Sequence, residues 1–286
     1  MDTEKKINAV DDECSKTLPP ELESKLGRLK EYIGSLGSLA VGFSGGVDSS
    51  FLLAAAHDVL GDKVVAVTGA DASVPERELK EAKAFCSERG IKHIICTVDP
   101  LKEEGYRYNG PDRCYFCKHG IFTEVKRIAD EYGIEHMAEG SNMDDIGDYR
   151  PGLRAAADLA VKSPLREAGL YKSDIRLISK FMGLPTWSKP AYACLASRFV
   201  YGEEITEEKL HMIDRAEQFL IEHGFFEERL RMHGKMARIE VPPADIARLA
   251  SDGIREAVYK ELKTIGFTFV ALDLGGYKTG SMNATL

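Results

Sequence analysis

LAVGFSGGVDSS, residues 39 to 50, combines the three local patterns that decide the fold. Leu39 to Phe43 is a short apolar run typical of a buried strand, and Ser49 to Leu60 predicts a helix. Between them, Ser44 to Ser50 is a loop of glycines and serines. Glycines let the backbone approach a ligand closely, and free N–H groups at a helix N-terminus attract phosphate oxygens. A glycine-rich turn with a serine cap is the simpler interpretation, but the complete seven-residue string in this position favours a phosphate-binding loop.

Strand and helix patterns alternate beyond this loop. Strands are predicted at 63–68, 91–98 and 134–138, and helices at 76–89 and 120–132. Such alternation is typical of an α/β fold in which helices cover both faces of a parallel sheet. Because ligands bind these sheets beyond the carboxyl ends of the strands, we expect the loops that begin there to line the site.

The chain divides into three expected segments. We predict a disordered tail at residues 1–18, a parallel-sheet nucleotide-binding domain at 19–200 and a small α+β domain at 201–286. The last domain follows from helices predicted at 206–223, 243–250 and 254–265, and from strands at 229–233, 236–241 and 267–272. A length of 286 residues, of which 44% are hydrophobic, is enough for two modest cores.

The charge balance argues against nucleic acid as the main partner. The formal net charge is −8, from 38 basic and 46 acidic side chains, whereas proteins that bind nucleic acid usually carry a basic surface. Residues 150–198 nevertheless hold nine Lys or Arg and three acids. This local excess suits a small phosphorylated substrate, and a solvated helix face is an equally good alternative.

The chain also lacks the patterns of a membrane or secreted protein. No apolar run approaches the roughly 20 residues that cross a bilayer, and the first residues are acidic and polar where a signal peptide is basic and then apolar. We therefore expect a cytoplasmic protein without membrane contact. In that reducing compartment, the six cysteines favour catalytic or metal-binding thiols over disulfides.

Three of these cysteines have cationic neighbours. Cys114 and Cys117 form a CxxC flanked by Arg113 and Lys118, and Cys194 lies in the stretch KPAYACLASR. CxxC is a recurring metal-ligand spacing, and nearby cations favour the thiolate. A redox disulfide is the alternative for the pair, and an inert buried cysteine is the alternative for Cys194. The other three cysteines lack such neighbours and are expected to be non-functional: Cys14, Cys86 and Cys96.

The glycine loop lacks the lysine of the Walker sequence and resembles the PP-loop of the ATP pyrophosphatase superfamily. Members of that superfamily cleave ATP between the α and β phosphates. Seven stretches carry a closer resemblance: SGGVDSS, PDRCYFCK, EGSNMDD, DYRPG, SPL, KPAYACLASRF and LDLGGYKTGSMN. Together they resemble the LarE family of sulfur transferases, from about residue 40 to the C-terminus. The resemblance implies a PP-loop domain of the adenine nucleotide alpha hydrolase type at 19–200.

The resemblance implies a specific reaction. LarE proteins use ATP and Mg²⁺ to adenylate the carboxylates of pyridinium biscarboxylic acid mononucleotide, and convert them to thiocarboxylates during synthesis of the nickel-pincer nucleotide cofactor. Some members sacrifice the sulfur of one cysteine, at the position of Cys194. Others resemble this chain in having the CxxC as well, and three cysteines can hold a 4Fe–4S cluster with one iron open to hydrosulfide. We favour the cluster, with sacrifice of Cys194 as the alternative.

The resemblance also assigns site residues by motif. It gives the sulfur chemistry and the cluster ligands to Cys114, Cys117 and Cys194. ATP contacts are expected from Ser44, Gly45, Gly46, Asp48, Ser49 and Ser50. Contacts to AMP or Mg²⁺ are expected from Glu139, Ser141, Asn142 and Asp144, with Glu139 as a metal ligand; a loop held by Asx turns is the alternative. The substrate phosphate is expected at Arg198, Arg229 and Arg231, and a solvated strand face is the alternative for the last two.

Three other functions share part of this pattern. An amidating synthetase would explain the ATP loop but would leave the three thiols unused. A tRNA thiolase shares the loop and the cluster, but the acidic total charge argues against it. A nucleotide-binding regulatory protein with structural zinc is the non-catalytic alternative. The main prediction remains an enzyme with a small nucleotide substrate, and we expect it to form a homo-oligomer.

Overall fold

A four-stranded parallel sheet forms the larger part of the molecule. The computed structural model describes residues 17–146, 151–190 and 193–278. The sheet contains β1 (Leu39–Gly42), β2 (Val64–Ala70), β3 (Lys92–Thr97) and β4 (His136–Ala138), in the order β3-β2-β1-β4. Every pair of neighbouring strands is parallel. The expected α/β class is therefore confirmed.

Strand residues alternate between two apolar layers on opposite faces of this sheet. Leu39 and Val41 of β1 join one core, which also contains the buried residues of α2 (Pro20–Leu36), α3 (Val47–Leu60) and α4 (Glu76–Glu88). Ala40 belongs to the other core, under α6 (Arg113–Glu131) and α7 (Pro151–Asp158). This alternation is the period-two pattern of a strand that is buried on both faces. Because β1, β2 and β4 run parallel, their carboxyl ends lie at one edge of the sheet.

The helix that carries the CxxC is longer than predicted. We expected a helix at 120–132, whereas α6 runs from Arg113 to Glu131 and includes both cysteines in its first two turns. Gly110 and Pro111 disfavour a helix just before Arg113, and the residues from Arg113 to Lys118 include neither glycine nor proline. Gly120 allows close packing, because an added Cβ would stand 3.2 Å from a methyl group of Val98.

Shorter elements complete this part of the chain. The remaining helices are α5 (Glu104–Arg107), α7 (Pro151–Asp158), α8 (Pro164–Glu167) and α9 (Lys172–Phe181). Single 3-10 turns occur at η1 (Gly61–Lys63), η2 (Pro100–Lys102), η3 (Met143–Asp145), η4 (Pro185–Ser188) and η5 (Leu195–Arg198). Within the residues that the structure describes, no helix is long and apolar enough to cross a membrane.

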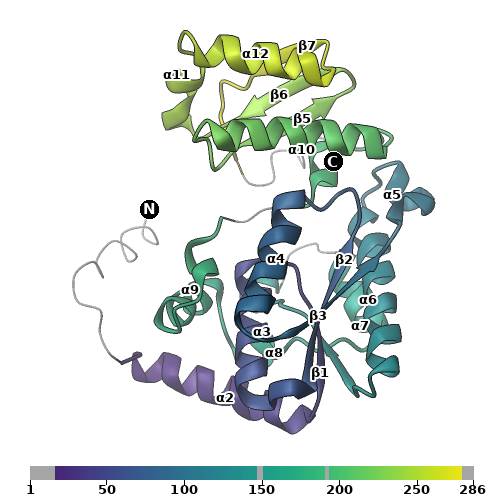
Figure 1. Cartoon of the computed structure of the whole chain (residues 1–286), viewed down its shortest axis with the longest axis vertical. Coiled ribbons are helices and arrows are strands. Elements are labelled where there is room, and N and C mark those ends of the chain that lie inside the picture. Colours follow the sequence, from purple (N-terminus) through teal and green to yellow (C-terminus); the bar gives the residue numbers. More distant parts are fainter. Residues whose placement is uncertain (1–16, 147–150, 191–192, 279–286) are drawn as a thin grey trace.

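A smaller mixed sheet lies at the other end of the molecule (Figure 1). Its strands are β5 (Arg229–His233), β6 (Met236–Glu240) and β7 (Phe269–Leu272); β5 and β6 are antiparallel, and β6 and β7 are parallel. The helices beside it are α10 (Glu207–Glu222), α11 (Ile246–Leu249) and α12 (Ile254–Ile265), and one more 3-10 turn is η6 (Pro243–Asp245). A further small domain with helices and a mixed sheet is thus confirmed.

The two parts share apolar contacts. Tyr106 of α5 and the segment Leu195 to Phe199 belong to the same buried cluster as the core of the smaller sheet. Arg77 of α4 lies 3.5 Å from Asp214 of α10. The domain boundary near residue 200 stays a prediction, and the expected tail falls mainly on residues 1–16, outside the described chain.

Candidate active site

The PP-loop after β1 is held in shape by its own serines. The hydroxyls of Ser44 and Ser49 lie 3.0 Å apart, and Ser49 Oγ also accepts a hydrogen bond from the Ser44 N–H at 3.3 Å. Gly45 has φ of 70°, a conformation that favours glycine. An added Cβ at Gly45 would also stand 3.4 Å from the Cβ of Ala82 on α4. The loop is therefore held by its own hydrogen bonds and packed against α4.

The N-terminus of α3 opens from this loop. Its N-cap, Gly46, has no side chain to accept hydrogen bonds from the first turn. The N–H groups there lack intrahelical acceptors, so that they and the positive end of the helix dipole are available to an anion. Asp48 keeps one buried oxygen, Oδ1, without a partner among the described residues. Ser50 points into the core and is fully buried.

The second loop of the site follows β4 and touches the first. An added Cβ at Gly140 would stand only 3.0 Å from the Ser49 N atom, so this close approach requires glycine. Asn142 Oδ1 accepts a hydrogen bond from the Asp144 N–H at 2.9 Å, and the Asn142 N–H donates to Asp145 at 2.8 Å. The Asx turn that we considered as an alternative is therefore present. β1 and β4 are neighbours at the point where the strand order reverses, which is where α/β sheets bind ligands.

Two lysines pair with the carboxylates of these loops. Lys172 Nζ lies 2.5 Å from Asp48 Oδ2, and the Lys172 N–H donates to Asp144 at 2.7 Å. Lys118, next to the CxxC, lies 3.7 Å from Glu139, whose other oxygen accepts from Ser163 at 2.9 Å. The position of Lys172 was missed from the sequence, because nothing in its neighbours distinguished it within the basic stretch 150–198.

Arg113 brings the two thiol-bearing segments together. Its Nη2 lies 3.7 Å from Cys114 Sγ, and its Nη1 donates to the Ala196 carbonyl at 2.9 Å, two residues beyond Cys194. The N–H of Leu195 donates to the Ser73 carbonyl at 3.0 Å, which places this segment beyond the end of β2. The three thiols therefore lie at the same edge of the sheet as the PP-loop.

The pKa values of two thiols reflect this proximity. Burial raises the pKa of Cys117 well above its usual value, and the neighbouring charges of Cys194, Asp71 and Cys114 add to the rise. Cys194 is accessible to solvent, yet the protein around its sulfur raises its pKa by desolvation, and the charge of Arg113 opposes that rise. The guanidinium group of Arg113, which can stabilise thiolates, therefore lies between the helix of Cys114 and Cys117 and the segment of Cys194.

Asp71 and Tyr106 extend this thiol cluster and were missed from the sequence. Asp71 follows β2, and its Oδ1 accepts a hydrogen bond from the Ser73 N–H at 2.6 Å. Burial raises the pKa of the Asp71 carboxyl group and of the Tyr106 hydroxyl group. Neither residue belongs to a stretch with a recognisable motif. Only the position of Asp71 after a predicted strand could have suggested it.

The remaining cysteines lie apart from the site. Cys86 and Cys96 are buried in the two cores beside the sheet, and burial raises the pKa of Cys86 to about 12. Cys14 lies outside the described residues. Across residues 17–146, 151–190 and 193–278, no three His, Cys, Asp or Glu side chains stand close enough to hold a single metal ion. That holds for Glu139 and for the three thiols alike.

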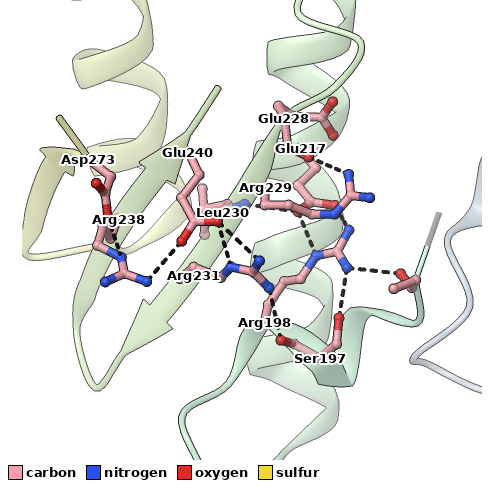
Figure 2. A network of polar contacts seen from close by, with 11 residues as sticks. Ser197, Arg198, Glu217, Glu228, Arg229, Leu230, Arg231, Arg238, Glu240 and Asp273 are labelled. Atoms are coloured by element: carbon pink, nitrogen blue, oxygen red, sulfur yellow. Dashed lines mark hydrogen bonds and ion pairs between the residues drawn. The ribbon is translucent and has the colours of Figure 1, made fainter. Parts of the chain in front are cut away.

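The three arginines assigned to substrate phosphate lie in a network of buried charges beside the smaller sheet (Figure 2). Arg198 makes two hydrogen bonds to Glu217, at 2.8 and 2.9 Å. Arg231 makes an ion pair with Glu240 at 3.0 Å, and Arg229 donates to the Glu228 carbonyl at 2.6 Å. The alternative of a solvated strand face is wrong, because Arg229 and Arg231 are buried. Their role in phosphate binding stays a prediction.

Comparisons with known proteins identify the family. Residues 22–107 match the family model described as NAD synthase, a stretch that contains the PP-loop and ends before Cys114. The chain is 35% identical to the pyridinium-3,5-bisthiocarboxylic acid mononucleotide synthase of Lactiplantibacillus plantarum, over 93% of this chain and 96% of that protein. The chain belongs to the LarE family. An uncharacterized Synechocystis protein is 40% identical, over 93% and 99% of the two chains.

A more distant similarity is to an enzyme of another function. A subunit of the glutamine-hydrolyzing GMP synthase of Archaeoglobus fulgidus is 26% identical over 70% of this chain and 69% of its own length. The similarity to the pyridinium-3,5-bisthiocarboxylic acid mononucleotide synthase, by contrast, spans 93% of this chain.

Proposed function

We propose that the chain is an ATP-dependent sulfur transferase that acts on pyridinium biscarboxylic acid mononucleotide. The observation that carries this proposal is the placement of three thiols and the PP-loop at one edge of the same sheet, joined through Arg113 and Ser73. Family membership supports the substrate, because a relative with 35% identity is the pyridinium-3,5-bisthiocarboxylic acid mononucleotide synthase. The proposed products are a thiocarboxylate, AMP and pyrophosphate.

The reaction has two displacements. In the first, a substrate carboxylate oxygen attacks the α-phosphorus of ATP, and the bond to the β-phosphate breaks. Pyrophosphate leaves onto the N–H groups of the PP-loop, where the dipole of α3 stabilises its charge. In the second, a sulfur nucleophile attacks the acyl carbon and AMP departs with the former carboxylate oxygen. Lys118 and Lys172 supply positive charge beside the two loops.

The donor groups fit Mg²⁺ and an iron–sulfur cluster. Asp48 Oδ1 is a buried oxygen without a partner in the described chain, and Asp144 stands in the neighbouring loop, so both would suit Mg²⁺ held with ATP. Cys114, Cys117 and Cys194 provide three soft ligands. In a 4Fe–4S cluster each thiolate binds a different iron, so the sulfurs need not converge on one ion. When bound, the cluster would supply an iron open to hydrosulfide.

The decisive experiment measures the product and the cluster together. Protein purified without oxygen should contain iron and acid-labile sulfide, and should convert the dicarboxylate mononucleotide, ATP and sulfide to a thiocarboxylate that mass spectrometry detects. Cys114→Ala should lose both iron and product. Zinc without iron would overturn the cluster. Loss of the Cys194 sulfur after one turnover would replace the cluster with sacrifice of that residue.

An amidating synthetase is the second candidate, because the chain is similar to a subunit of GMP synthase. An amidating synthetase that acts on a carboxylate would use ammonia to displace AMP and would form an amide. Incubation with ammonium in place of sulfide separates the two functions. The net charge of −8 argues against a tRNA thiolase, and a tRNA binding assay with a salt titration tests that case. We further propose a cytoplasmic homo-oligomer, and light scattering of the purified protein tests the assembly.

A further inference from the structure

Lys189 is a largely buried cation that joins the PP-loop to α4. Its Nζ donates to the Gly45 carbonyl at 3.1 Å, to Glu78 at 2.8 Å and to Glu81 at 2.6 Å. The Lys189 side chain is 11% exposed and that of Glu78 is 9% exposed, so the bond between them is largely shielded from solvent, whereas Glu81 is 57% exposed. The main chain is held as well, because Arg176 of α9 donates to the Lys189 carbonyl at 2.9 Å. The side chain of Lys189 is therefore bonded to the PP-loop and to α4, and its main chain is bonded to α9.

Lys189 is also one end of the segment that carries Cys194. It stands five residues before the cysteine, and the residue after the cysteine, Leu195, is bonded through its N–H to the Ser73 carbonyl at 3.0 Å. Lys189 and Leu195, two described residues on either side of Cys194, are thus each bonded to the site. Lys189 is at the loop that binds the leaving group, and Leu195 is beside the thiol cluster.

The charges around Lys189 make its contacts sensitive to an anion in the PP-loop. One ammonium group lies between the carboxylates of Glu78 and Glu81, which leaves this group of three side chains with net charge −1. A diphosphate on the neighbouring N–H groups would bring further negative charge next to Gly45. It would compete with the two carboxylates for the ammonium group, because the attraction grows as the separation falls. Loading the loop should therefore change the position of Lys189.

We propose that Lys189 is a positioning residue that links occupancy of the PP-loop by the diphosphate of ATP to the placement of Cys194. This inference rests on the proposed function, because sulfur transfer requires the thiol of Cys194 to be placed after ATP has bound. Lys189 would act through its bonds to Gly45, Glu78 and Glu81. The thiol is then placed for sulfur transfer when the leaving group is in its loop.

The chain contains its own reporter for this movement. Trp187 is the only tryptophan in the sequence and lies two residues before Lys189. Its carbonyl accepts a hydrogen bond from Arg176 at 2.6 Å, and Lys180 Nζ stands 4.8 Å from the centre of its ring. Displacement of Lys189 would change the contact of Arg176 with the Trp187 carbonyl and the contact of Lys180 with the Trp187 ring. Tryptophan fluorescence therefore reports on this segment in the intact protein without a label.

The test titrates the wild type, Lys189→Met and Lys80→Met with magnesium pyrophosphate and with MgATP. Lys80 is an exposed lysine of α4 paired with Glu76 at 2.9 Å, and its variant is the matched control. In the wild type and in the control, the Trp187 emission should change with the half-saturation measured by equilibrium dialysis. Lys189→Met should still bind both ligands, with affinity lowered about tenfold or less, but without the change in emission. Lys189→Arg should restore part of the response.

Turnover gives the second measurement. In Lys189→Met, the rate of thiocarboxylate formation should fall about tenfold to a hundredfold, and the rate of AMP formation should fall less. The reason is that adenylated substrate, when the sulfur is not placed to attack it, is hydrolysed by water and still releases AMP. A Lys189→Met protein with a wild-type emission response, or with an unchanged ratio of AMP to thiocarboxylate, would overturn the link. If the wild type neither binds ATP nor forms AMP, the proposed function itself fails, so the two failures are distinguishable.

Discussion

Glu228 is a buried acid whose charge Arg77 and Arg229 offset only in part. Its side chain is fully buried, and neither carboxylate oxygen has a hydrogen-bond partner among the described residues. Burial, together with the charge of Glu217, raises the pKa of this carboxyl group to about 8. The residue lies beside the arginine network of Figure 2. Its ionisation should therefore affect the stability of the smaller part.

The pH dependence of stability tests this residue. A folded-state pKa of about 8, against an ordinary value of 4.5, means that protonated Glu228 contributes stability below pH 4.5, and that this contribution is lost as the pH rises towards 8. Glu228→Gln cannot ionise, so it should be more stable than the wild type by roughly 4 kcal/mol at pH 8 and by only about 1 kcal/mol at pH 5. Urea unfolding at both pH values measures this. Equal differences at both values would contradict it.

The sequence predicts some residues of the site and misses others for a physical reason. The PP-loop and the CxxC are contiguous motifs, so their chemistry is visible in a short stretch of sequence. Lys172 and Asp71 act through partners more than 20 residues away, and no local pattern marks them. Lys189 lies in the motif of Cys194, but its partners Glu78 and Glu81 are more than 100 residues away and are not marked by that motif. The burial of Arg231 was hidden in the same way, because its partner Glu240 lies on another strand.

At the scale of elements, the contact between the two loops of the site should be sensitive to a single methyl group. Gly140→Ala would place a Cβ 3.0 Å from the Ser49 N atom and 3.2 Å from the Asp48 carbonyl carbon, both of them backbone atoms with little freedom. Overpacking of this kind costs about 1–3 kcal/mol. Because the PP-loop takes that strain, we expect ATP binding to weaken roughly tenfold, as measured by calorimetry.

The control for this substitution lies on α2. Gly27 has nothing within 4 Å of an added Cβ, and it stands in the middle of a helix. Gly27→Ala should leave ATP binding unchanged and raise the stability by about 0.5–1 kcal/mol. Wild-type affinity in Gly140→Ala would show that the two loops do not depend on each other.

The element pattern was the easiest feature to predict. Strands β1 and β2 are apolar on both faces, and the strands of the parallel sheet are separated by helices, so their order of occurrence follows from periodicity. The start of α6 was harder, because the CxxC stretch has neither the apolar stripe of a helix nor the alternation of a strand. Its helical form follows from packing and from the break at Gly110 and Pro111, which short windows of sequence do not reveal.

At the scale of the whole molecule, the two parts should unfold together. Tyr106, Leu195 and Phe199 lie in the buried cluster of the smaller sheet, although they come from the larger part of the sequence. Phe199→Ala should therefore cost about 3–5 kcal/mol and shift the unfolding curves of both parts. Trp187 fluorescence reports on the larger part, and far-ultraviolet circular dichroism reports on both. Coincident transitions are expected.

An exposed phenylalanine provides the comparison. Phe269 on β7 is 65% exposed, so Phe269→Ala should change the stability by less than about 1 kcal/mol. If Phe199→Ala shifted only the circular dichroism curve and left the Trp187 curve in place, the two parts would be independent folding units. The expected boundary near residue 200 would then separate two parts that unfold independently.

The position of the CxxC on α6 restricts how its spacing can vary. Successive helical residues are rotated by about 100° around the axis, so sulfurs three positions apart face nearly the same way, whereas sulfurs two positions apart face nearly opposite directions. Deleting one residue between Cys114 and Cys117 would thus turn one thiol away from Cys194, although the composition hardly changes. For this pair, the angular periodicity of the helix decides which spacings can serve the chemistry.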